Sequence, residues 1–167
     1  MARGYELVVR TFKEQQRKQG IGTYSFSRDC DRPTDSQINN GWGAPVKPVG
    51  LIVSSFRPSD DATQFGFLIP SNMFAVVSLR QLSEIEHTVY NHIDFAKECI
   101  ALADEVDAAI RRYGTFNHPI CGRVYALKWT DTAISSAWMM LIFPVCCLLL
   151  IWDIVLSRMQ FTKILVN

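Results

Sequence analysis

The sequence lacks several features that would assign it to a common functional class. It has no excess of one charge, because 17 Lys and Arg are balanced by 16 Asp and Glu. Proteins that bind nucleic acids normally carry a basic surface, so we expect no such partner. The chain has no CxxC pair, and no histidine lies at zinc-finger spacing from its five cysteines. We therefore expect neither a metal ion nor another cofactor.

Signals for cellular targeting are also scarce. Residues 1–6 lead directly into a charged amphipathic pattern without an apolar stretch, so the sequence predicts no secretory signal. It contains no Asn-x-Ser/Thr site for glycosylation. The sequence leaves the cellular compartment undefined.

Apolar residues recur at helical spacing in three segments. These are 5–19, a segment that begins with Ser71 or Asn72 as its N-cap, and 94–113. Gly20 and Gly114 stand where helices commonly end. Residues 21–68 have neither a helical nor a strand period, and 116–128 look extended, with a short strand at 124–126. Helices with so little strand between them predict an all-α fold.

The long segment 21–68 contains most of the residues suited to chemistry. Two adjacent carboxylates follow an arginine in Arg57-Pro58-Ser59-Asp60-Asp61, and aromatic residues lie nearby. A carboxyl group can protonate a glycosidic oxygen once its pKa is raised, and a neighbouring carboxylate helps to raise it. Asp and Ser are equally favoured in surface turns and helix caps. The residue types alone leave both interpretations open.

Longer motifs resemble one enzyme family. Four runs carry the resemblance, which spans about residues 4–125. They are Glu6 to Gln16, Asn40-Gly41-Trp42-Gly43 to Gly50, Gly50 to Ala62 with its Arg57-Pro58-Ser59-Asp60-Asp61, and Phe67 to Val77 with its Pro70-Ser71-Asn72-Met73-Phe74. They resemble the signature stretches of glycoside hydrolase family 125. The motifs are too long and specific for chance to explain them.

The resemblance implies an (α/α)6 barrel that removes α-1,6-linked mannose from an α-mannoside oligosaccharide, with inversion and without a metal. It implies that a loop aspartate, Asp60 or Asp61, is the general acid. Asp61 is favoured slightly because it lies closer to the following helix. Arg57, Ser59 and Asn72 become sugar-binding or loop-orienting residues. Trp42 could stack on a sugar or anchor its loop on the core.

Two departures from the family pattern lead us to expect a partial barrel that is inactive alone. Twelve helices need roughly 200 residues, and only three helices are predicted before the C-terminal region. The family's Asp-Asp-Ala-Asn motif and its general-base glutamate do not follow residues 122–126. An inverting glycosidase needs two carboxyl groups with a water between them.

An apolar tail replaces that family sequence. Residues 133–152 form a run of 20 residues without a charge, long enough to cross a bilayer as a helix. We therefore divide the chain into a family-like domain at 1–128 and a tail at 129–167. The tail is either an artefact of the gene model or a membrane anchor. In the second case the alternative function is a non-enzymatic single-pass membrane protein whose soluble helices serve as an interaction module.

Overall fold

The computed structural model describes residues 4–120, 122–126, 128 and 129. The helices in this part are α1 (Gly4–Gln15), α2 (Ile69–Thr88) and α3 (Ile93–Tyr113), with a short 3-10 helix, η1, at Pro33–Asp35. The strands are β1 (Phe67–Leu68), β2 (Thr115–His118), β3 (Gly122–Tyr125) and β4 (Lys128–Trp129). The mainly helical class is confirmed. The short strands add two small sheets to it.

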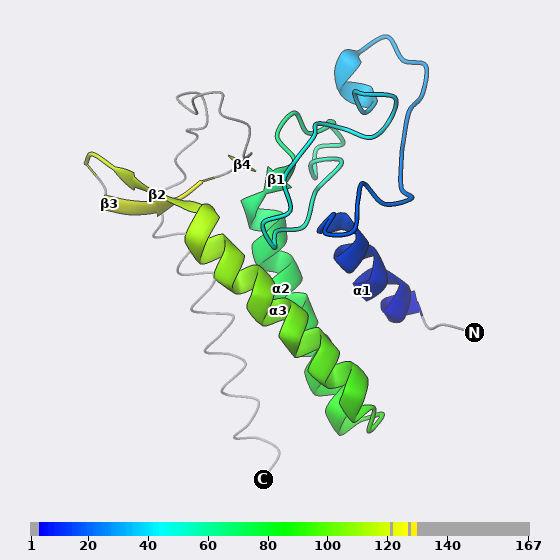
Figure 1. Cartoon of the computed structure of the whole chain (residues 1–167), viewed down its shortest axis with the longest axis vertical. Helices are drawn as coiled ribbons and strands as arrows, with labels where there is room; N and C mark the ends of the chain where they lie inside the picture. Colours follow the sequence, from blue (N-terminus) through cyan, green and yellow to red (C-terminus); the bar gives the residue numbers. More distant parts are fainter. Residues whose placement is uncertain (1–3, 121, 127, 130–167) are drawn as a thin grey trace.

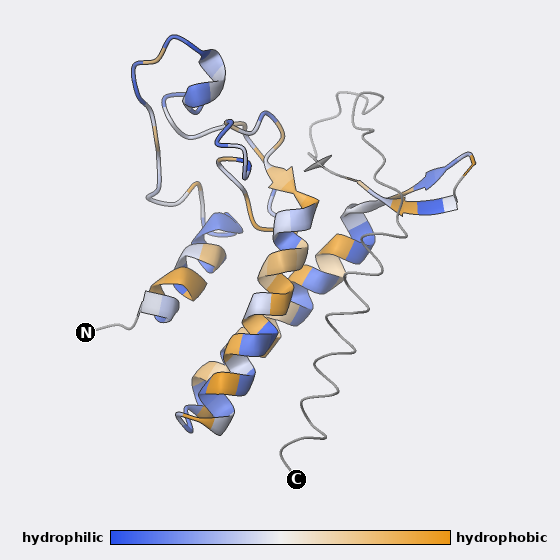
Figure 2. Cartoon of the chain, turned by 180° about the vertical axis from the view of Figure 1, so that it is seen from behind, coloured by the Kyte–Doolittle hydropathy of each residue, from blue (hydrophilic) through white to orange (hydrophobic). Residues whose placement is uncertain are grey.

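Helices α2 and α3 form the body of the fold. They lie side by side along their length, joined by a short turn, with α1 beside them (Figure 1). They pack through apolar, buried residues: Met73, Val76 and Leu79 on α2, and Cys99, Ala103, Val106 and Ile110 on α3. Figure 2 shows hydrophobic stretches in orange on both helices. The apolar stripes expected from the helical spacing also include Ile85 and Ile100. These stripes are therefore confirmed, except that these two residues at their edges are exposed.

Helix α1 is fixed to α3 by an aromatic contact and by an ion pair. The Tyr5 and Phe95 rings lie 5.8 Å apart, and Lys13 Nζ lies 2.5 Å from Glu98 Oε1. The predicted end of this helix at Gln19 was wrong, since the helix ends at Gln15. Beyond it, Arg17 has a φ of 56°, and the buried Gln16 donates from Nε2 to Gly50 O at 2.8 Å. These tertiary contacts turn the chain out of the helix.

The start of α2 also differs from the prediction. The helix begins at Ile69, with a proline in its first turn and no side-chain cap. A proline is favoured there because the first helical N–H groups have no partner in the helix. Asn72, one of the two predicted caps, instead directs its side chain to the preceding loop.

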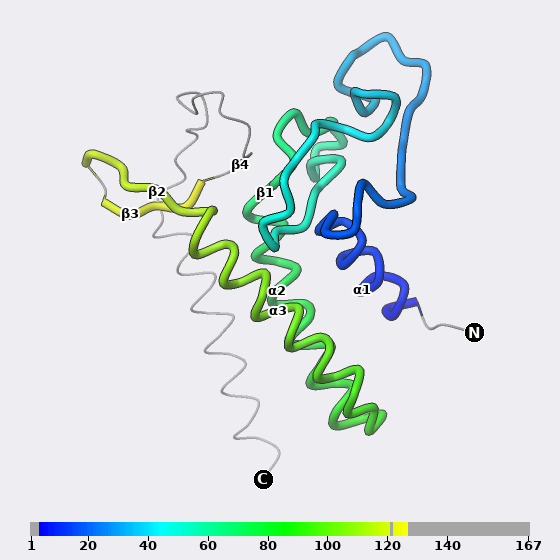
Figure 3. Tube along the Cα trace, viewed as in Figure 1, coloured from blue at the N-terminus to red at the C-terminus, as the bar shows by residue number. Residues whose placement is uncertain are grey.

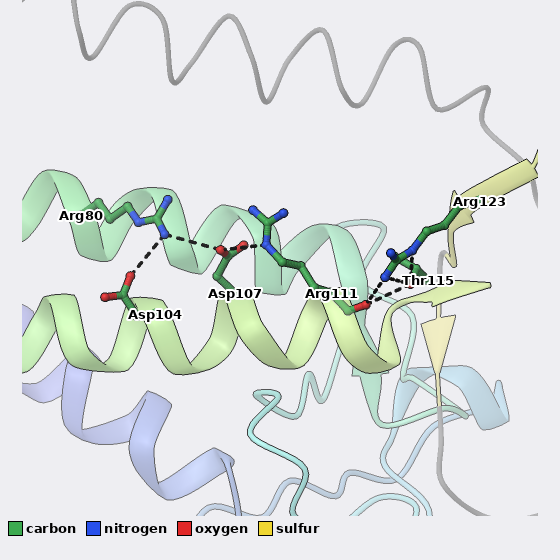
Figure 4. A network of polar contacts seen from close by, with 6 residues as sticks. All are labelled: Arg80, Asp104, Asp107, Arg111, Thr115 and Arg123. Carbon is green, nitrogen blue, oxygen red and sulfur yellow. Dashed lines mark hydrogen bonds and ion pairs between the residues drawn. The ribbon is translucent and has the colours of Figure 1, made fainter. Parts of the chain in front are cut away.

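Two antiparallel pairs of strands follow the helices. β2 pairs with β3 as a hairpin, and β4 pairs with β1, with Phe67 opposite Trp129. Figure 4 shows how polar contacts continue from α2 and α3 into this hairpin. Asp107 lies between Arg80 and Arg111, and Arg123 Nη2 donates to Arg111 O at 2.8 Å. Arg123 thereby satisfies a carbonyl at the end of α3.

The predicted membrane span at 133–152 lies outside the described residues. None of the helices within the described part is long and apolar enough to cross a membrane.

Candidate active site

The Arg57–Asp61 motif forms a tight hairpin turn. Phe56 and Ala62 form an antiparallel bridge. Inside it, Arg57 N donates to Asp61 O at 2.8 Å and Asp60 N donates to Arg57 O at 2.9 Å. Asp60 has a φ of 62°, a left-handed conformation that Asp tolerates better than most residues. The turn therefore presents its two adjacent carboxylates with a fixed backbone.

The two aspartates have different surroundings. Arg57 Nη2 lies 2.7 Å from Asp61 Oδ2, and Ser59 Oγ donates to the same oxygen at 2.6 Å. A charge-assisted bond of this kind fixes the orientation of a carboxylate. Asp60 is exposed. The structure thus brings the predicted residues Arg57, Ser59, Asp60 and Asp61 together in one turn.

The stem of the hairpin, residues 54–56 and 62–66, is joined by local contacts. Thr63 N donates to Ser55 O at 3.0 Å, and the buried Thr63 hydroxyl donates to Ser54 O. Ser54 N donates to Gly66 O at 2.9 Å. These contacts fix the base of the turn that carries the carboxylates.

A distant part of the chain, around η1, supports the hairpin from another side. The Phe26 and Phe56 rings meet edge to face with centroids 5.3 Å apart. Ala62 N donates to Thr34 O at 2.7 Å, and Gln37 Nε2 donates to Ser55 O. Phe26, Thr34 and Gln37 were not predicted from the sequence. They lie 20 to 31 residues before Arg57 and follow no local pattern that could have identified them.

The side chain of Asn72 is buried and hydrogen-bonded to the backbone of the loop that precedes α2. Its Oδ1 accepts from Ile52 N at 2.7 Å, and its Nδ2 donates to Ile52 O and to Leu68 O, both at 3.0 Å. Every hydrogen-bonding group of the amide except one lone pair is thus engaged. Asn72 was predicted either to bind the sugar or to orient the loop. These hydrogen bonds are those of a loop-orienting residue.

Trp42 lies in a turn that requires its two glycine neighbours. Gly41 and Gly43 have φ values of 88° and 74°, and a Cβ at Gly41 would lie 2.9 Å from the carbonyl carbon of Phe26. Trp42 O accepts from Arg17 Nη2 at 2.9 Å. Burial lowers the pKa of the Arg17 guanidinium. The half-buried Trp42 is therefore held in the loop that also contains Phe26 and Gln37.

Among the described residues, no group of three or more His, Cys, Asp or Glu side chains could hold a metal ion. The chemistry of the hairpin is that of carboxyl groups beside a cation.

Comparison with known proteins connects this hairpin to an enzyme family. Residues 1–140 match the family model of the metal-independent alpha-mannosidases, GH125. The chain belongs to this family. The match includes the whole Arg57–Asp61 hairpin and all three helices of the described part, so the resemblance found in the motifs is confirmed.

Comparison with two relatives of this GH125 chain shows what share of their length it matches. It is 35% identical over 106 residues to the meiotically up-regulated gene 157 protein of Schizosaccharomyces pombe, covering 63% of this chain and 21% of the relative. It also resembles the solved structure of a metal-independent α-mannosidase from Streptococcus pneumoniae, in a non-productive complex with α-1,6-mannobiose. That similarity has a TM-score of 0.72 and 31% identity, and covers 78% of this chain and 31% of the other. The chain thus spans between a fifth and a third of these relatives.

Proposed function

We propose that this chain supplies the proton-donating part of an exo-acting α-1,6-mannosidase site. The observation that carries the proposal is the hairpin itself, in which Arg57 and Ser59 hold Asp61 beside the exposed Asp60. Its support comes from membership of the α-mannosidase family and from the α-1,6-mannobiose bound to the S. pneumoniae relative. Family membership favours this function over a non-enzymatic membrane protein.

The two carboxyl groups act as a unit in this proposal. One donates a proton to the oxygen that leaves with the departing sugar, while the other lies beside it in the same turn. Arg57 and Ser59 keep Asp61 in one orientation, which reduces the motion needed to reach the transition state. Asn72 orients the loop through Ile52, and Trp42 provides an aromatic surface in the neighbouring turn.

The fold that completes the site is the (α/α)6 barrel of the family, to which this chain contributes α1, α2 and α3. An inverting glycosidase needs a second carboxylate about 6.5–9.5 Å from the acid to activate water. We propose that this base is supplied by another part of the barrel, and that the chain alone releases no mannose.

The test uses the S. pneumoniae enzyme with its matched segment replaced by residues 4–126 of this chain. Asp60→Asn and Asp61→Asn are compared with Asp29→Asn, an exposed aspartate of the same loop. Replacing the acid should lower kcat on α-1,6-mannobiose by about 10² to 10⁴-fold. The loss should be much smaller on an aryl mannoside, whose leaving group needs no proton.

Full activity in both single Asn variants would overturn the assignment of the acid to this hairpin. The original chain is assayed in parallel. If it released mannose faster than its Asp60→Asn/Asp61→Asn double variant, a second carboxylate would have to lie within this chain.

A further inference from the structure

Arg17 is a buried arginine whose partners are backbone carbonyls. It is 7% exposed, and none of the ion pairs in the described part of the chain includes it. Its Nη2 donates to Trp42 O at 2.9 Å and its Nη1 to Ala44 O at 3.4 Å, whereas Nε has no partner among the described residues. A buried cation is normally paired with a carboxylate, because removing it from water costs free energy. The stability of the fold therefore does not account for this arginine.

The turn that Arg17 contacts, residues 39–43, has an unusual backbone, and we call it the Trp42 turn. Its φ values lie between 54° and 88° at four of the five positions: Asn39, Asn40, Gly41 and Gly43. Side chains other than that of glycine rarely adopt this left-handed conformation, although asparagine tolerates it better than most. Strained backbone of this kind persists only where its surroundings hold it, and it is concentrated at ligand sites. The two carbonyls that bind Arg17 lie on either side of Gly43, so one guanidinium holds the end of the turn.

The side chain of Trp42 is available for a ligand. Trp42 was expected either to stack on a sugar or to anchor its loop on the core. It is half-buried, and it is not among the side chains that pack against the hydrophobic core of the described part. Its indole N–H donates to none of the described residues. The indole thus offers an apolar face and a hydrogen-bond donor, and a sugar ring presents both C–H groups and hydroxyl oxygens to such a surface.

Two side chains connect the Trp42 turn to the hairpin of the proposed active site. Phe26 N donates to Gly41 O at 2.9 Å, and the Phe26 ring meets the Phe56 ring. Gln37 donates to Ser55 O in the stem of the hairpin. Figure 3 shows the wide excursion that the chain makes between α1 and β1, in which these contacts lie. The turn and the two carboxylates therefore belong to one connected part of the molecule.

We propose that a mannose ring of the substrate stacks on Trp42, and that Arg17 is the positioning residue that holds Trp42 in place for it. The inference rests on the mannosidase function proposed above, and adds to it a sugar-binding surface with its support. Arg17 contacts the Trp42 turn directly, but reaches the hairpin only through Phe26 and Gln37. Loss of Arg17 therefore weakens sugar binding more than it slows proton transfer.

The experiment measures kcat and KM for α-1,6-mannobiose in the S. pneumoniae enzyme that carries residues 4–126 of this chain. Arg17→Met removes both hydrogen bonds to the turn and keeps an unbranched side chain. It should raise KM about tenfold, which is the size of one aromatic contact, and lower kcat by no more than about threefold. Arg17→Lys keeps the charge and can donate to one carbonyl, so its KM should lie between the two. The control is Arg32→Met, at an exposed position of the same loop, which should change neither constant.

A second variant separates positioning from general support of the fold. Trp42→Leu should raise KM by about the same factor, about tenfold. Adding Arg17→Met to it should raise KM by less than about twofold more, because both residues act through one contact. Losses that multiply in the double variant would overturn the positioning role. Should Arg17→Met fail to fold, Arg17→Lys takes its place in this cycle.

An unchanged KM in Trp42→Leu would overturn the stacking surface. This outcome is distinct from a failure of the mannosidase assignment, because the Asp60→Asn and Asp61→Asn variants report on the acid through kcat. A KM that rose in Trp42→Leu but stayed at its original value in Arg17→Met would refute the role of Arg17 alone.

Discussion

Replacing Asn72 with alanine should destabilise the fold strongly, because its side chain joins α2 to the loop that leads to the hairpin. The change removes three hydrogen bonds, one from Ile52 N and two to Ile52 O and Leu68 O. Ile52 and Leu68 are themselves buried, so water cannot replace the lost partner. Asn72 itself is 1% exposed.

The magnitude follows from these contacts. Each net hydrogen bond contributes about 1 kcal/mol, and a buried group left without a partner costs about 1–3 kcal/mol. We therefore expect Asn72→Ala to lower the free energy of unfolding by about 3 kcal/mol or more. This is a large part of the roughly 5–15 kcal/mol that stabilises a typical domain. Gln81→Ala, at an exposed position of the same helix, should change it by less than about 0.5 kcal/mol.

The measurement is urea unfolding of the whole chain, followed by far-UV circular dichroism. Asn72→Asp serves as a second variant, because it keeps the acceptor for Ile52 N and loses both donors. Its buried carboxylate would face two carbonyl oxygens, so it should be least stable at neutral pH and recover in part when acid protonates it. A loss below about 1 kcal/mol for Asn72→Ala would refute the loop-orienting role and favour the sugar-binding alternative.

Two further outcomes follow from the structure. Gly41→Ala should destabilise the chain by about 1–3 kcal/mol in the same urea assay, because the φ of Gly41 is 88° and the new Cβ would meet the Phe26 backbone. The control is Gly4→Ala, where the new Cβ meets nothing within 4 Å. An unchanged unfolding midpoint for Gly41→Ala would contradict this reasoning. Burial raises the pKa of the Cys99 thiol to about 11, so iodoacetamide at pH 8.5 should alkylate the exposed Cys30 and spare Cys99 in the native chain. Peptide mapping by mass spectrometry reads both sites, and equal labelling would show that Cys99 is accessible.

The raised pKa of the Cys99 thiol also determines the direction in which the stability of the fold changes with pH. Its pKa is raised in the folded state, so the unfolded chain releases its proton first, above a pH of about 8.5. The contribution of Cys99 to stability is therefore constant below that pH and decreases as the pH rises toward about 11. A midpoint of urea unfolding that did not fall between these values in the wild type, relative to Cys99→Ala, would contradict the assignment.

The helices were predictable because their packing is periodic along the sequence. Val76 and Leu79 on α2, with Val106 and Ile110 on α3, repeat every three or four residues, and the structure buries them together. Errors arose where a polar side chain serves a distant part of the chain. The end of α1 was placed too late, because nothing local shows that Gln16 reaches Gly50.

The residues of the turn at the centre of the candidate site could be predicted from the sequence, whereas the residues that pack around this turn could not. A contiguous motif identified Arg57, Ser59, Asp60 and Asp61, which the structure places in one turn. Phe26 and Gln37 reach the hairpin from a segment with no periodic pattern, through an aromatic contact and a hydrogen bond to a backbone carbonyl. Contacts of this kind depend on the path of the chain in space, so residue types and spacing could not reveal them.

The same contacts explain how a long segment without regular structure can position the candidate site. In a helix or sheet, backbone groups satisfy one another, whereas in residues 21–66 buried side chains do much of this work. Each of the buried polar residues involved bonds to a loop carbonyl or amide: Gln16 to Gly50, Arg17 to Trp42, Gln37 to Ser55, Thr63 to Ser54 and Asn72 to Ile52. Four of these five lie outside the helices, in the segment that follows α1 or in the stem of the hairpin. The precision of the site therefore depends on a set of single hydrogen bonds rather than on the apolar packing of α2 against α3. We therefore expect a substitution in that set to displace the carboxylates even where the two helices remain packed, which would separate the residues that build the fold from those that build the site.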